Sequence, residues 1–231
     1  MKIIAHRCGT DVFPEQTIHA ARYSLQAGAD LAEVDIRFAK DGTPVVIHDK
    51  TPASLYGCDT PVEELTGTEF LALRRTADRA YCGYSFYDYL ACGIDRMLFH
   101  NKIGGERLRD IAALCEKNGI ADKVVFGVQS PEDVRIVKGY NNNIKVLAFM
   151  PRVNGINDFA EAGADYIRLW EKWCSDENIA AVRAAGKKLW IMTDTPTVGE
   201  VGEGCYAFYE KCGADGILVN QVLPALAYYR R

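Results

Sequence analysis

The sequence contains no apolar run that approaches the length of a membrane-spanning helix. Between Lys2 and His6 it has only three apolar residues, too few for the hydrophobic region of a signal peptide. An excess of positive charge is also absent, since 27 Lys and Arg face 31 Asp and Glu and the formal net charge is −4. This balance argues against a nucleic-acid partner but leaves room for a small basic pocket. We therefore expect a cytoplasmic protein without stable membrane insertion.

Paired cysteine motifs are absent as well. The chain has eight cysteines, but none of them forms a CxxC pair and their spacing is irregular. A zinc ribbon or a disulfide framework would need such a pattern. We expect reduced thiols that are mostly buried as small hydrophobic side chains.

A pattern of helix, glycine and short apolar run recurs along the chain. Glycine suits the left-handed residue that ends a helix, and a run rich in Val, Ile and Leu suits a buried strand. The pattern is seen in QAGADLAEVDI, LACGIDRMLFHN, KNGIADKVVFGV, EAGADYIRLW, AAGKKLWIMT and KCGADGILVN. With KIIAH and KVLAFM, it predicts strands at 2–6, 31–38, 97–101, 123–128, 145–149, 165–169, 188–192 and 215–219.

Eight alternating strands and helices favour an α/β fold of the (βα)8 TIM-barrel type, with catalytic groups at the carboxyl ends of the strands. A doubly wound open sheet is the alternative, but no GxGxxG motif follows the first strand. A length of 231 residues suits one barrel. We therefore predict a single domain over residues 1–231, whose oligomeric state the sequence does not indicate.

The run PVVIH at 44–48 lies outside this pattern. Asp41-Gly42 before it is a two-residue hairpin signal, so we expect the run to pair antiparallel with the second strand. Cross-strand partners that sum to 83 would then place Asp35 opposite His48.

Residues 50–95 are longer than an ordinary barrel loop, and we predict an insertion at the carboxyl face with short helices in TPVEELTGTEFLALRR and SFYDYLACG. Its aromatic side chains either line a substrate cleft or pack the insertion onto the barrel. They are Tyr56, Tyr81, Tyr84, Phe86 and Tyr87.

The second predicted strand, LAEVDI, is unusually charged. Glu33 and Asp35 are two residues apart and therefore point to the same face of a strand. Two buried carboxylates need a compensating cation. Mg²⁺ or Ca²⁺ suits these oxygen ligands, and an ion pair with a barrel Arg or Lys is the alternative.

The strand in MLFHNK places His100 and Lys102 on one face by the same rule. If that face is inward, an imidazole that can bind metal and an ammonium that can hold phosphate enter the same site. His100 could equally be a hydrogen-bonded core histidine.

These motifs together resemble the glycerophosphodiester phosphodiesterase family. HR followed by PEQT, then GADLAEVD, then KDGTPVVIHD resemble the family's HRG, PEN, ExD and DGxPVVxHD stretches. The resemblance is dense over residues 5–49 and thinner afterwards.

The resemblance implies a barrel that hydrolyses phosphodiesters at a divalent metal. His6 and His48 would be the general acid and base, and Arg7 a phosphate contact. Glu33 and Asp35 would be metal ligands. For the family's PEN glutamate, which lies near metal and substrate, the matching residue is Glu15, although a carboxylate in the first turn of a helix is also favourable without any catalytic role.

Two further residues have competing interpretations. Trp190 in KKLWIMTD resembles a family tryptophan and is either an apolar wall of the substrate pocket or a core residue. His19 lies on the first predicted helix, where we expect it to face solvent.

Several positions depart from the family pattern. The strand with the family's E-x-K motif reads His100-Asn101-Lys102, so the lysine is present and the third carboxylate ligand is not. A histidine there would shift metal preference towards Mn²⁺, Zn²⁺ or Fe²⁺. Cys8 replaces a glycine and Gln16 an asparagine.

Three functions remain open. The first is hydrolysis of a soluble glycerophosphodiester, such as the choline or ethanolamine compound, to glycerol 3-phosphate and an alcohol, with either the glycerol hydroxyl or water as nucleophile. The second is a phosphodiesterase of lysophospholipase D type, although no amphipathic membrane helix is evident. The third is a barrel that binds a phosphate ligand without hydrolysing it, because it lacks the third carboxylate.

Overall fold

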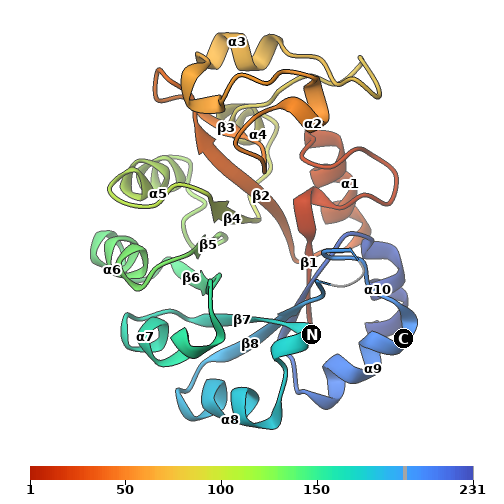
Figure 1. Ribbon diagram of the computed structural model, residues 1–231, viewed down its shortest axis with the longest axis vertical. Coiled ribbons are helices and arrows are strands. Elements are labelled where there is room, and N and C mark those ends of the chain that lie inside the picture. The colour runs from red at the N-terminus through yellow and green to blue at the C-terminus, as the bar shows by residue number, and fades with distance from the viewer. Residues whose placement is uncertain (195–196, 231) are drawn as a thin grey trace.

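The computed structural model describes residues 1–194 and 197–230 and is a closed parallel barrel surrounded by helices (Figure 1). The ring closes because β1 (Lys2–Ala5) pairs with β2 (Leu31–Phe38) on one side and β9 (Gly216–Val219) on the other. Between them lie β4 (Met97–Asn101), β5 (Val125–Val128), β6 (Lys145–Ala148), β7 (Tyr166–Trp170) and β8 (Lys188–Met192). This arrangement confirms the TIM-barrel prediction and the eight predicted strands.

Helices connect the strands, as the sequence pattern predicts. The α-helices are α1 (Ile18–Ala27), α2 (Ala53–Tyr56), α3 (Gly67–Ala72), α4 (Phe86–Ala91), α5 (Arg107–Lys117), α6 (Pro131–Tyr140), α7 (Ile156–Glu161), α8 (Asp176–Ala184), α9 (Glu203–Lys211) and α10 (Val222–Tyr229). Shorter 3-10 helices are η1 (His6–Cys8), η2 (Val62–Glu64), η3 (Val153–Gly155) and η4 (Glu171–Trp173). Among the described residues, no helix is both long enough and apolar enough to span a bilayer.

Local signals define where the helices begin and end. The side chain of Thr17 accepts a hydrogen bond from the Ala20 amide at the start of α1, and Ser130 does the same for Asp133 at the start of α6. The glycines in the repeated pattern all have positive φ, as expected for residues that close helices. They are Gly28, Gly93, Gly119, Gly163, Gly186 and Gly213.

Strand alternation separates two layers of core. Ile3 points outwards and packs in the main core with apolar residues from the surrounding helices. Ile4 points inwards into a cluster that fills the barrel, together with Leu98, Leu147 and Trp190. Because the interior is filled below the carboxyl ends of the strands, polar groups can gather only at the open end of the barrel.

The hairpin register is one residue different from the prediction. Partners on β2 and β3 (Pro44–Val46) sum to 82, and Asp35 lies opposite Ile47, whose amide donates to the Asp35 carbonyl at 3.0 Å. The predicted pairing of Asp35 with His48 is therefore wrong. The turn holds three residues instead of two, because Gly42 adopts φ 85° after a turn closed by its amide and the Ala39 carbonyl at 2.9 Å.

The segment after β3 packs beside the barrel, where Figure 1 shows α2 and α3 beyond the end of β2. Tyr56, Val62 and Phe70 form a small core with residues of the hairpin, while Phe86 is buried in the main core. These contacts support the packing interpretation for Tyr56 and Phe86, whereas Tyr87 is exposed. That residues 1–231 form one domain stays a prediction.

The three-residue turn generates a stability prediction. We expect Gly42→Ala to destabilise the protein by about 1–2 kcal/mol, because an L side chain is strained at positive φ. The measurement is the urea concentration at the unfolding midpoint.

Gly139→Ala is the matched control, since Gly139 lies inside α6 with nothing within 4 Å of an added Cβ. There alanine should stabilise the helix by about 1 kcal/mol. Equal midpoints for the two variants would contradict the turn geometry.

Candidate active site

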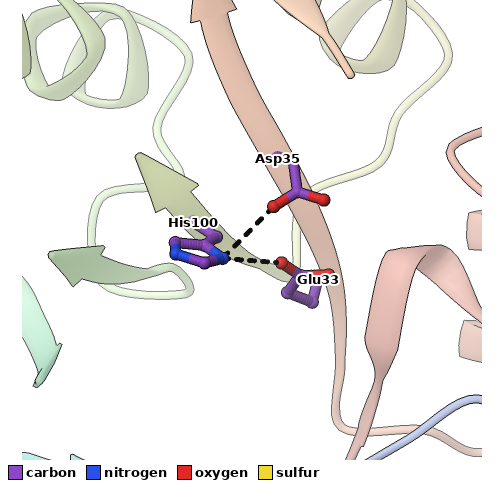
Figure 2. Close-up of side chains that lie close together, drawn as sticks. All are labelled: Glu33, Asp35 and His100. Carbon is purple, nitrogen blue, oxygen red and sulfur yellow. Dashed lines mark ion pairs between the residues drawn. The ribbon is translucent and has the colours of Figure 1, made fainter. Parts of the chain in front are cut away.

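Glu33, Asp35 and His100 converge at the open end of the barrel (Figure 2). The register of β2 and β4 pairs Asp35 with His100, and strand alternation brings Glu33 to the same face. His100 Nδ1 lies 3.2 Å from Asp35 Oδ1 and 3.6 Å from Glu33 Oε1. One potential ligand atom from each residue lies within 4.8 Å of the others. The structure therefore brings the three predicted metal ligands together.

The protein holds the outer oxygen of each carboxylate. The Arg7 amide donates to Glu33 Oε2 at 2.6 Å, and Gln16 Nε2 donates to Asp35 Oδ2 at 2.5 Å. Within the described chain, the buried inner oxygens, Glu33 Oε1 and Asp35 Oδ1, accept no hydrogen bond. Buried carboxylate oxygens left without a hydrogen bond are expensive unless a cation binds them. The donor set thus fits a divalent cation.

Lys102 provides an internal cation for the same group. Its Nζ lies 2.9 Å from Asp35 Oδ1, which is an ion pair without hydrogen-bond geometry, and 2.9 Å from His100 Nδ1. Burial alone would raise the pKa of Asp35, but its contacts with His100 and Lys102 outweigh burial and hold the pKa well below its usual range. His100 and Lys102 therefore share one face, as predicted. The alternative prediction for the buried carboxylates, an ion pair with a barrel lysine, is also correct for Asp35.

The protonation of His100 decides which neighbour it contacts. A proton on Nδ1 would face Asp35 Oδ1 at 3.2 Å, whereas an unprotonated Nδ1 accepts a hydrogen bond from Lys102 Nζ. Only the second form can bind a metal ion through Nδ1, the nitrogen that faces the two carboxylates. The ring is held in place by stacking on Phe149, with centroids 4.1 Å apart.

His6 lies at the end of β1 and is 6% exposed. Its Nδ1 is 2.6 Å from Asn220 Oδ1, while Asn220 Nδ2 donates to the Val198 carbonyl at 2.9 Å. The second bond fixes the orientation of the amide, so Nδ1 of His6 is the donor and Nε2 carries the lone pair. Burial lowers the pKa of His6 below 6.5, only partly offset by the charge of Glu33. A neutral imidazole at pH 7 follows.

His48 is oriented in the same way by a different partner. Its Nδ1 lies 2.7 Å from Asp49 Oδ1, and Asp49 also accepts from Ser54. The hydrogen bond with His48 is the main reason that the pKa of Asp49 is lowered. Although the predicted contact with Asp35 is wrong, His48 still lines one cavity with His6 and His100.

Arg7 and Glu15 form an ion pair of 2.8 Å beside His6. Both residues line a cavity of about 480 Å³. It adjoins the cavity lined by the three histidines, because His6 and Arg7 line both. Glu15 is not in the first turn of α1, because this helix begins at Ile18 after the Thr17 cap. The helix-dipole interpretation of Glu15 is therefore wrong.

Unusual backbone conformations support these contacts. Arg7, Cys8 and Gln16 have φ of 49°, 74° and 56°, in the left-handed region that non-glycine residues rarely adopt. The Gln16 amide donates to the Arg7 carbonyl at 2.8 Å, which joins the two strained segments. Strain of this kind persists where surrounding contacts over-determine it, and it is common at functional sites.

The cavity lined by the three histidines has a volume of about 190 Å³ and is also lined by residues that the sequence did not point to. Phe149, Arg168, Trp170 and Met192 line it together with the three histidines. The signal was present in the strand alternation, which places Arg168 and Trp170 on the inner face of YIRLW. Asn220, which orients His6, was also missed and directly follows the last strand.

Trp190 occupies a different place from the one proposed for a substrate wall. It is fully buried and stacks on Tyr166 inside the barrel, with ring centroids 4.6 Å apart. Trp190 is therefore a core residue, the second of its two predicted roles.

His19 on α1 is exposed, as the sequence predicted.

Comparisons with solved structures agree with the barrel fold. The crystal structure of a glycerophosphodiester phosphodiesterase from Agrobacterium tumefaciens superposes with a TM-score of 0.80 at 22% identity, covering 96% of this chain and 98% of that one. One from Thermotoga maritima gives a TM-score of 0.76 at 18% identity, covering 98% and 97%. At these identities the likeness shows the fold.

Curated relatives match over a short segment. Glycerophosphodiester phosphodiesterase from Caldanaerobacter subterraneus is 47% identical over 49 residues, which are 21% of this chain and 20% of the relative. Human glycerophosphodiester phosphodiesterase 1 is 48% identical over 48 residues, 21% of this chain and 14% of the relative. The match thus spans about a fifth or less of the length of these two relatives.

The family signature covers much more of the chain. The glycerophosphoryl diester phosphodiesterase family matches residues 6–145, more than half of the 231 residues, and this range includes His6, Glu33, Asp35 and His100. The chain therefore belongs to the glycerophosphoryl diester phosphodiesterase family.

Proposed function

We propose that this protein hydrolyses a small glycerophosphodiester to glycerol 3-phosphate and an alcohol, with a divalent cation held by Glu33, Asp35 and His100. The observation that carries the proposal is the convergence of two buried, hydrogen-bond-free carboxylate oxygens on an imidazole nitrogen. Oxygen ligands favour Mg²⁺ or Ca²⁺, whereas the imidazole adds affinity for Mn²⁺, Zn²⁺ or Fe²⁺.

A phosphodiester resists attack because its anionic oxygens repel a nucleophile. A bound cation would supply positive charge at these oxygens. Lys102 Nζ lies beside the same carboxylate and has further protons with which to hold a phosphate oxygen. Arg7 adds a guanidinium at the adjoining cavity, where Glu15 fixes its orientation. These groups act before and during the reaction by positioning the phosphate and reducing the repulsion.

Proton transfer falls to His6 and His48. Each ring has Nδ1 engaged by a side-chain oxygen, from Asn220 and Asp49 respectively, so Nε2 is left for substrate in both. A positioned imidazole with one nitrogen fixed by a neighbour is the arrangement that general acid–base catalysis requires. Because burial keeps His6 neutral, we assign it the role of base and His48 that of acid.

A non-hydrolytic barrel that binds a phosphate ligand is the second candidate. It is favoured by the ion pair between Lys102 and Asp35, which neutralises that carboxylate without any metal. The presence of His100 at the position of the third family carboxylate points the same way. The hydrolase proposal is stronger, because the ion pair between Lys102 and Asp35 leaves Glu33 Oε1 buried and without a hydrogen bond in the described chain.

The histidine pair generates the first activity prediction. We expect His6→Ala and His48→Ala each to lower kcat by about 100-fold to 10,000-fold, the usual contribution of a general acid or base. The measurement is release of glycerol 3-phosphate from glycerophosphoethanolamine. His19→Ala is the control, since His19 is an exposed histidine on α1 and should retain wild-type activity. Full activity in either pocket variant would remove that residue from the mechanism.

Cation binding can be measured without activity. After treatment with a chelator, we expect Mn²⁺ at 100 times its Kd to stabilise the wild type by about 3 kcal/mol, seen as a rise in Tm. Glu33→Gln and Asp35→Asn should abolish this rise, because each removes an anionic ligand. Glu132→Gln, on the exposed side of α6, should not change it. An unchanged Tm in the wild type with Mn²⁺, Mg²⁺ and Ca²⁺ would contradict the metal site.

The variant His100→Glu separates the two candidate functions. If the protein is a hydrolase, the wild type is active and the variant shifts metal preference towards Mg²⁺ and Ca²⁺, because an oxygen ligand replaces a nitrogen ligand. The measurement is activity with each metal in turn. An inert wild type together with an active variant would establish the binding barrel instead.

A further inference from the structure

Arg168 is a buried cation that the proposed chemistry does not use. It lies on β7 and is 4% exposed, yet its Nε and Nη1 make no hydrogen bond within the described residues. Arginine is almost never enclosed in this way without a partner. Unpaired, buried donors that line a cavity point to a ligand that supplies the missing acceptors.

The surroundings of Arg168 are aromatic instead of acidic. Its guanidinium carbon lies 3.8 Å from the centroid of Trp170 and 5.3 Å from that of Phe149. Among the described residues, Asp194 is the acidic side chain whose charge raises the pKa of Arg168, and its Oδ2 forms an ion pair with Lys172. Burial lowers the pKa of Arg168 to about 9, so the group remains charged at pH 7. A buried cation that forms no ion pair among the described residues therefore lines the cavity.

The other cations near the cavity are paired. Arg7 contacts Glu15, and Lys102 contacts Asp35. These contacts lie on the side of the barrel formed by β1, β2 and β4. In the closed ring, β7 lies diametrically opposite β2. A ligand with its phosphate near Glu33 and Asp35 would therefore extend its other end towards Arg168.

Resting on the proposed function, we propose that Arg168 binds an anionic group on the alcohol portion of the substrate, so that the preferred glycerophosphodiester carries a carboxylate or a second phosphate there. A guanidinium matches the oxygens of both groups.

The same geometry disfavours a choline group. The aromatic faces of Trp170 and Phe149 could otherwise hold a quaternary ammonium, but the guanidinium of Arg168 already lies over them. An ammonium group brought to this end of the cavity would meet a like charge in a desolvated setting, which strengthens the repulsion. Arg168 thus acts as a specificity-determining residue.

The test compares substrates that differ by one anionic group. Glycerophosphoserine differs from glycerophosphoethanolamine by a carboxylate, and glycerophosphoglycerol phosphate differs from glycerophosphoglycerol by a phosphate. For wild type, we expect KM to be about tenfold or more lower for the anionic member of at least one pair, the effect of one charged hydrogen bond. The pair that shows the preference identifies which anion is recognised.

Arg168→Gln should remove this preference by raising KM for the anionic member while kcat and the KM of its partner change little. Arg168→Lys should restore part of it, because the charge is retained. Arg135→Gln is the control for loss of an arginine, since Arg135 lies exposed on α6. An equal change in KM for both members of each pair, or no change, would overturn the inference.

Direct binding separates this inference from the hydrolase proposal. Calorimetric titration of the four compounds measures affinity whether or not they are cleaved. Tighter binding of an anionic member that depends on Arg168, without turnover of any compound, supports the inference and contradicts the proposed hydrolysis. Turnover of all four compounds with no Arg168-dependent preference contradicts the inference alone. If Arg168→Gln does not fold, as judged from its Tm, the comparison of wild type with Arg168→Lys decides.

Discussion

Two carboxylates buried side by side on β2 are the constraint on which the rest of the site depends. An ionised carboxylate inside a protein costs more free energy than a domain of this size has in reserve, unless it is hydrogen-bonded or paired. In this fold, one oxygen of each carboxylate accepts a hydrogen bond from the protein, and the other oxygen faces His100. The Arg7 amide and the Gln16 side chain hold the outer oxygens. The positions of the two carboxylates are therefore fixed by a backbone amide and a side-chain amide that lie behind them.

The backbone strain near β1 follows from this requirement. Arg7 must turn its amide towards Glu33, and Gln16 must turn its side chain towards Asp35, and both do so with positive φ. Cys8 also has a left-handed backbone, which explains why the family has glycine at this position. Here its thiol instead lies 3.5 Å from the Tyr89 hydroxyl, and burial strongly raises the pKa of the thiol. This cysteine is a buried packing residue, not a nucleophile.

The sequence predicted the strands and the faces of their side chains well, but it did not predict the register or the stagger between neighbouring strands. Apolar runs identified all eight barrel strands, and the two-residue period placed Glu33 with Asp35 on one strand face and His100 with Lys102 on another. That the two faces meet at one site followed only from the barrel and the family resemblance. The hairpin register was missed because Asp41-Gly42 is compatible with turns of two or three residues, and one residue changes every cross-strand pair. Trp190 was ambiguous because its height in the barrel depends on stagger between strands, which a periodicity does not contain. The sequence did not predict that Arg168 lines the site, because a lone arginine on a strand is ordinarily exposed to solvent.

Phe149 is a core residue that also contacts two groups of the site. Its ring stacks on His100 and also lies beneath the guanidinium of Arg168, so one side chain contacts both the candidate metal site and the cationic side of the cavity. The ring can occupy this place because Gly127 has no side chain, and a Cβ there would collide with it. An aromatic ring also excludes water between the two charged regions, which keeps the local dielectric low and each interaction strong. The separation of charge across the cavity is thus built into the barrel core, and under the proposed function it would set the direction in which an asymmetric diester lies.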